Sequence, residues 1–103
     1  MRMYITESDI TYIRWAKSQL EMGDFSVCVV DNKVCFYKKE YPETIVCHYT
    51  KSNDSIWRYF SDVPDGIEQS ELFRIVYFMG DVTSTGLTID ELKDVLEWCT
   101  DKK

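Results

Sequence analysis

Residues 25–38, FSVCVVDNKVCFYK, decide the fold class of this chain. Two runs of β-branched and aromatic residues, 25–30 and 33–38, have the composition and alternation of strands. Between them lies Asp31-Asn32, a pair typical of the two-residue turn that joins antiparallel strands. The stretch therefore predicts a β-hairpin.

A third run, TIVCHY at 44–49, extends the hairpin into a three-stranded antiparallel meander. The two-residue turn also predicts the register, because turn type and loop length fix which residues of a hairpin face each other. The predicted facing pairs are Val27 with Phe36 and Val29 with Val34 on one side of the sheet, and Cys28 with Cys35 on the other.

A helix is predicted to begin at Thr6, before the hairpin. Thr6 and Asp9 have the spacing of a capping box, in which each side chain accepts a hydrogen bond from the other residue's backbone N–H. Ile5 and Ile10 flank this cap at the positions of a hydrophobic staple, and Gly23 is the expected helix end.

Two further helices are predicted directly after the meander. The first is a short helix within 51–60, with Asn53 or Asp54 as its cap. The second runs from about 68 to 79 and is apolar almost all round between Leu72 and Met79. A helix of that kind is typically the buried centre of a small domain, and Gly80 is its expected end.

Residues 81–92, DVTSTGLTIDEL, begin like a calcium-binding loop. Position 12 of such a loop must be a bidentate Glu, however, and here it is Leu92. The alternative is a helix start, since Thr88 and Glu91 have capping-box spacing. We therefore predict a turn and a cap, followed by a last helix over 88–100.

Together these elements predict one α+β domain over residues 1–103: an N-terminal helix, a three-stranded antiparallel sheet, then a short helix and two C-terminal helices packed on the sheet. No apolar run approaches the ~20 residues of a membrane span. The N-terminal residues turn polar too early for a secretory signal, so we expect a cytoplasmic location and reduced cysteines.

The formal net charge is −6 and is concentrated in the second part of the chain. Residues 1–39 carry six basic and five acidic side chains, whereas residues 40–103 carry six basic and thirteen acidic ones. This distribution counts against direct binding to nucleic acid, which requires a basic face. It is compatible with a basic protein partner.

Four carboxylates on the last predicted helix fall within a stripe about 60° wide. We call this stripe the acidic ridge; its members are Asp90, Asp94, Glu97 and Asp101. Like charges at such spacings destabilise a helix by a few tenths of a kcal/mol per pair. Carboxylates spaced ~5–6 Å apart by the helix pitch also approach the phosphate spacing of a nucleic-acid strand.

Two tryptophans are predicted to lie outside the core. Trp98 is adjacent to the acidic ridge, and Trp15 lies away from the inward stripe of the first helix. Exposed aromatic residues of this kind are enriched at binding hot spots. A second acidic series, without an intervening base, comprises Asp62, Asp65, Glu68 and Glu71.

No catalytic constellation, metal site or cofactor motif is found in the sequence, so we predict a non-enzyme without metal or cofactor. Cys47 and the one histidine, His48, are neighbours on a predicted strand and should point to opposite faces. Cys28 or Cys35 is a candidate to approach His48 across strands, which leaves a thiol-dependent enzyme or redox sensor as an alternative.

The favoured hypothesis is a small acidic inhibitor that binds a basic, nucleic-acid-handling protein, acting as a nucleic-acid mimic. Short acidic immunity proteins and phage-encoded anti-defence proteins are similar in kind, although no sequence motif links the chain to them. The partner-binding residues of this hypothesis are Asp90, Asp94, Glu97, Trp98, Asp101 and Trp15. The sequence is also compatible with a solvated acidic surface that has no partner, and with a structural or assembly subunit.

Overall fold

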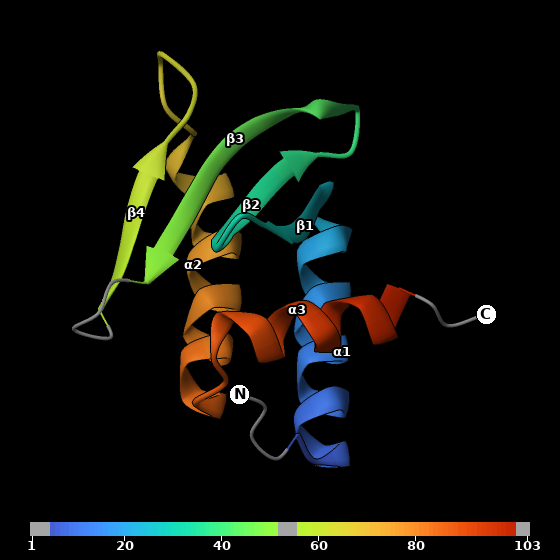
Figure 1. The fold of residues 1–103 in the computed structure, drawn as a ribbon. Helices are drawn as coiled ribbons and strands as arrows, with labels where there is room; N and C mark the ends of the chain where they lie inside the picture. The colour runs from blue at the N-terminus through green and yellow to red at the C-terminus, as the bar shows by residue number, and fades with distance from the viewer. Residues whose placement is uncertain (1–4, 52–55, 101–103) are drawn as a thin grey trace.

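The computed structural model describes residues 5–51 and 56–100, and in this part of the chain a four-stranded antiparallel sheet packs against three helices (Figure 1). The elements in chain order are α1 (Glu7–Met22), β1 (Phe25–Val30), β2 (Lys33–Lys38), β3 (Tyr41–Lys51), β4 (Trp57–Ser61), α2 (Gln69–Thr85) and α3 (Ile89–Thr100). Each strand pairs with the next one in sequence. The predicted α+β class is confirmed, but the sheet has four strands where three were predicted.

Helix α1 begins with the predicted capping box. The Asp9 N–H donates to Thr6 Oγ1 at 3.1 Å, and the Thr6 N–H donates to Asp9 Oδ2 at 3.2 Å. Gly23 caps the other end with an ordinary φ of −94°, and the next residue, Asp24, takes the left-handed conformation. Gly23 has a different constraint: a Cβ there would collide with the side chain of Arg74 from α2.

The hairpin has the predicted turn and register. Asp31 and Asn32 both have positive φ, 52° and 65°, as the favoured two-residue hairpin turn requires. The facing pairs are Val27 with Phe36, Val29 with Val34 and Cys28 with Cys35. The third strand, β3, is longer than predicted and begins at Tyr41.

The short helix predicted within 51–60 is wrong, because 57–61 form strand β4. The residues WRYF favour a strand, since aromatic side chains pack well on a pleated surface. Long strand β3 would also leave an unpaired edge without β4. The register sets Tyr49 opposite Tyr59. Asn53 and Asp54, the predicted caps, lie outside the described residues.

Helix α2 also differs from its prediction. It continues through Gly80 to Thr85, and Gly86 ends it in the left-handed conformation with φ 74°. It is not the buried centre of the domain, because its outward side exposes large apolar residues. Buried positions are confined to the other side, at Ile75, Phe78, Met79 and Val82.

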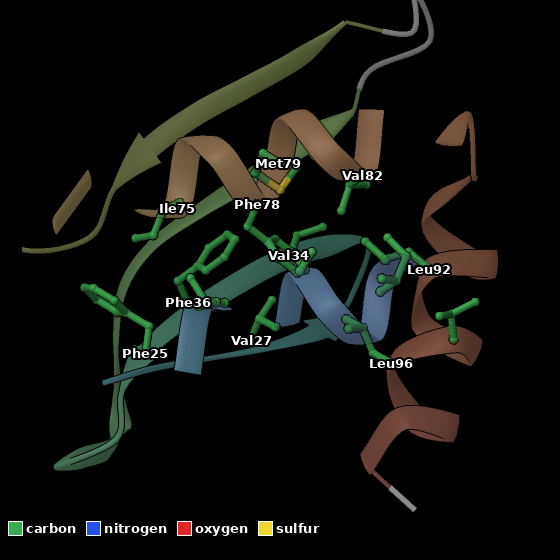
Figure 2. Close-up of a cluster of buried hydrophobic side chains, with 14 of the residues drawn as sticks. Phe25, Val27, Val34, Phe36, Ile75, Phe78, Met79, Val82, Leu92 and Leu96 are labelled. Atoms are coloured by element: carbon green, nitrogen blue, oxygen red, sulfur yellow. The ribbon is translucent and has the colours of Figure 1, made fainter. Parts of the chain in front are cut away.

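One hydrophobic cluster holds the three helices and the sheet together (Figure 2). Phe36 of β2 is fully buried within it, and its ring meets those of Phe78 (α2) and Tyr49 (β3) edge to face, at 5.8 and 6.0 Å. Leu92 and Leu96 bring α3 into the same cluster. Helix α1 packs on β1. The two C-terminal helices, for which packing on the sheet was predicted, also contact it: α3 packs on β1, and α2 contacts β2 through Phe78.

Candidate protein-binding surfaces

A capping box positions α3 and fixes which of its sides faces solvent. The Glu91 N–H donates to Thr88 Oγ1 at 3.1 Å, and the Thr88 N–H donates to Glu91 Oε1 at 2.9 Å, as the sequence predicts. Glu91 is only 2% exposed, so its carboxylate is built into the helix start and is not part of the acidic ridge.

Replacing Glu91 with Ala is expected to lower the unfolding free energy by about 1–2 kcal/mol, the usual cost of losing a cap or leaving its backbone donor unpaired. Glu91→Gln is the matched control, because its amide oxygen still accepts from Thr88. Urea titration of both variants measures the difference. Equal losses in the two variants would mean that the charge, and not the cap, is what stabilises α3.

The acidic ridge lies on the side of α3 opposite to the core. Asp90 and Glu97 are exposed and Asp94 is partly exposed, whereas Asp101 lies outside the described residues. The buried side is formed by Leu92, Val95 and Leu96. The three described carboxylates therefore share one solvent-facing stripe, and the geometry leaves them accessible to a partner.

A lysine beside the ridge offsets part of its charge. Lys93 Nζ donates to Glu97 Oε2 at 3.0 Å, one helical turn away, and this hydrogen bond raises the pKa of Lys93. The pair is solvent-exposed, so a competing cation from a partner can replace it at little cost.

Trp98 flanks the same ridge and is 39% exposed. It follows Glu97 on the helix and is rotated about 70–80° from the ridge axis, away from Lys93. The ridge thus has a basic side chain on one flank and an aromatic ring on the other.

Trp15 belongs to a different surface, the groove between α1 and α2. It is 54% exposed, and its ring stacks on Tyr12 at 6.4 Å. Tyr12 in turn donates to Asp81 of α2 at 2.8 Å. A cavity of about 190 Å³ lies here and is lined by Trp15, Ala16, Gln19, Leu20, Arg74, Tyr77, Phe78 and Asp81.

The exposed apolar side of α2 was missed from the sequence. Phe73, Val76 and Tyr77 of α2 are 54%, 45% and 72% exposed, and the rings of Phe73 and Tyr77 stack at 6.2 Å. We call these three residues with Tyr12 and Trp15 the α1–α2 apolar surface. The sequence feature that could have indicated this surface is the apolar run of α2, whose side chains point to all sides of the helix. Such a helix is either buried by its own chain or covered by another.

The face of the sheet that points away from the core cluster carries a row of two thiols and an imidazole. Cys28, Cys35 and His48 face one another across β1, β2 and β3. His48 Nδ1 lies 2.7 Å from Asp62 Oδ2, and its ring stacks on Phe60 at 5.1 Å. The strand register thus places Cys35 directly opposite His48, which is the predicted approach across strands.

The environments of Cys35 and Cys47 do not favour a thiolate. Burial raises the pKa of Cys35, the residue paired with His48, and Cys28 raises it further. Cys47 points to the other face of the sheet, as strand alternation predicts, and burial in the core raises its pKa to about 12. Reactive cysteines have lowered pKa values instead.

Two of the four residues in the second acidic series are hydrogen-bonded to basic side chains. Asp62 is paired with His48, and Glu71 Oε2 accepts from Lys38 Nζ at 2.6 Å. Asp65 and Glu68 are exposed. This series therefore does not form one continuous acidic surface.

The stretch that resembles a calcium loop is helical at its start. Residues 81–85 are the end of α2, and Gly86 joins it to the Thr88 cap. In the part of the chain that the structure describes, no group of three or more His, Cys, Asp or Glu side chains is arranged to hold a metal ion. Among the same residues, no helix has the length and apolarity to cross a membrane.

Comparison with known proteins gives no match: no protein-family model, no curated protein and no solved structure is significantly similar to the chain.

Proposed function

We propose that the protein is a small acidic inhibitor that docks on a basic, nucleic-acid-handling protein through helix α3. The observation that carries the proposal is the acidic ridge itself, with Asp90 and Glu97 exposed on the side of α3 that faces away from the core, beside the exposed ring of Trp98. Clustered charge selects a partner of opposite charge and accelerates encounter, and an adjacent aromatic side chain supplies apolar contact area.

The shape of the ridge also supports mimicry of a nucleic acid. Its carboxylates repeat at about the helix pitch of 5.4 Å on a rigid element. Basic side chains that bind a row of phosphates in a nucleic-acid-handling protein would then find a row of carboxylates in a similar arrangement. The Lys93–Glu97 pair is exposed and is exchanged for a pair with the partner on binding.

A thiol-dependent activity is the less supported candidate. The pKa of Cys35 is raised and its side chain is buried, so neither the charge state nor the access suits a nucleophile.

Capture from a lysate of the source cell or its host tests the proposal. Wild type is expected to retain a basic protein, and Asp94→Lys/Glu97→Lys is expected to lose it, because the ridge then repels the partner. Asp65→Lys/Glu68→Lys is the matched control, since it makes the same change in net charge at exposed positions outside α3. Unchanged circular dichroism shows that both variants are folded.

Retention by the control and loss by the ridge variant support α3 as the site. Equal retention by all three proteins would overturn the assignment of the ridge. Loss in both variants would show that net charge alone, and not the position of the ridge, determines binding.

A further inference from the structure

Helix α2 has a glycine that the described residues around it do not explain. Gly80 lies inside a continuous helix, where Gly costs roughly 0.5–1 kcal/mol relative to Ala. Its φ is not positive, and an added Cβ would meet no described atom within 4 Å outside its two chain neighbours and the adjoining backbone of α2. Neither conformation nor internal packing therefore requires the missing side chain.

The glycine lies on the apolar outward side of α2. At 100° per residue, Phe73, Tyr77 and Gly80 fall within about 60° of one another, opposite to the buried side of the helix. A Gly on an exposed apolar stripe lets another helix approach closely, because the interaxial distance depends on the side chains at the contact. The stripe is thus shaped to receive a helix.

We infer that the occupant is a second copy of this chain, with the two α2 helices packed antiparallel about a two-fold axis that passes near Val76 and Tyr77. The large Phe73 and the small Gly80 are seven residues apart, so this symmetry sets Phe73 of each chain over Gly80 of the other. A two-fold interface must be self-complementary in this way.

The charges on the flank of α2 are self-complementary as well. Arg74 and Asp81 are also seven residues apart, and both line the groove beside α1. The two-fold operation brings Arg74 of one chain beside Asp81 of the other. With the axis midway between positions 76 and 77, Arg74 of one chain and Asp81 of the other are offset by two residues along the helix. That is a rise of about 3 Å, which the long Arg side chain can absorb.

The exposed apolar area is sufficient for a small dimer. An aromatic side chain offers roughly 150–250 Å² to bury. The exposed fractions of the four aromatic residues therefore give roughly 300–550 Å² per chain, before Val76 and the polar rim are counted. Two chains approach the total of about 1,000 Å² that a specific interface needs. The four residues are Tyr12, Trp15, Phe73 and Tyr77.

Analytical ultracentrifugation of the full chain tests this inference. We expect wild type to be dimeric at roughly 100 µM, and Gly80→Arg to weaken the dimer at least about tenfold, because the new side chain fills the space that Phe73 of the second copy occupies. Open space at Gly80 means that the substitution leaves the fold of the single chain intact, which circular dichroism and thermal unfolding check.

A charge exchange identifies the occupant. Asp81→Arg is expected to weaken the dimer, and the double variant Arg74→Asp/Asp81→Arg is expected to restore it. Asp94→Lys/Glu97→Lys is expected to remain dimeric, because the ridge lies on α3 and not on α2. The dimer can therefore be disproved without disproving the proposed function, and the reverse also holds.

A strictly monomeric wild type at roughly 100 µM would overturn the inference and leave the stripe to a helix of another protein. The inference is equally wrong if Gly80→Arg dimerises as tightly as wild type, or if the exchanged pair binds no better than Asp81→Arg.

Discussion

Phe36→Ala is expected to lower the unfolding free energy by about 3–5 kcal/mol, the usual cost of removing a buried aromatic side chain and leaving a cavity. Phe36 is fully buried, and its ring contacts Phe78 of α2 and Tyr49 of β3. Domains of this size are stable by only about 5–15 kcal/mol. The loss is therefore a large part of the total unfolding free energy. A urea titration followed by circular dichroism measures it.

Phe73→Ala is the matched control, because the same side chain is removed from a position that is 54% exposed. In dilute solution, where the chains are separate, its loss is expected to stay below about 1 kcal/mol. Similar losses for the two variants would contradict the core drawn in Figure 2, in which Phe36 joins the sheet to α2.

The protein is also expected to lose stability steeply as the pH rises from about 9 to about 12. Burial raises the pKa of Cys47 from 9.0 to about 12 and that of Tyr49 from 10.0 to about 12. A hydrogen bond with Cys28 and, next, burial raise the pKa of Tyr37 to about 12. The folded chain thus keeps at least these three protons at pH values where the unfolded chain releases them.

The sign follows from these raised values. Below about pH 9 the groups are protonated in both states and the stability is full, whereas above it ionisation lowers the free energy of the unfolded state relative to the folded state. Each such group lowers the unfolding free energy by at most about 1.4 kcal/mol per pH unit, and by less for the partly exposed tyrosines.

Unfolding free energies from urea titrations at about pH 8 and about pH 11 check this dependence. Tyr49→Phe keeps the ring but removes one ionisation, so its stability should fall less steeply with pH than that of wild type. A pH-independent stability over this range, or identical slopes for the two proteins, would contradict the burial assigned to these groups.

Local chemistry made much of the fold predictable. The Thr6 and Thr88 caps and the Asp31-Asn32 turn each depend on residues a few positions apart, and all three are present. Strand β4 was missed because its main stabilising partner, β3, is supplied by the sheet and not by its own short sequence. The strand propensity of residues 51–60 alone does not show that β3 is available to pair with them.

The candidate sites were predictable to a lesser degree. Helical periodicity correctly placed Trp15 and the described carboxylates of the ridge on exposed sides, but it gave no signal of the Lys93–Glu97 pair. The apolar run of α2 predicts a buried helix, whereas one of its sides is exposed. Sequence does not show whether the second apolar side of a helix is covered by its own chain or by another one.

The affinity for the captured basic protein, measured by calorimetry at low and high salt, tests the central claim most directly. Wild type and Asp65→Lys/Glu68→Lys are expected to bind alike and to weaken together as salt screens the contact. Asp94→Lys/Glu97→Lys is expected to bind about 10- to 100-fold more weakly at low salt, with little further change on adding salt. An affinity that is insensitive to salt, or that the ridge variant retains, would contradict docking through the acidic ridge of α3.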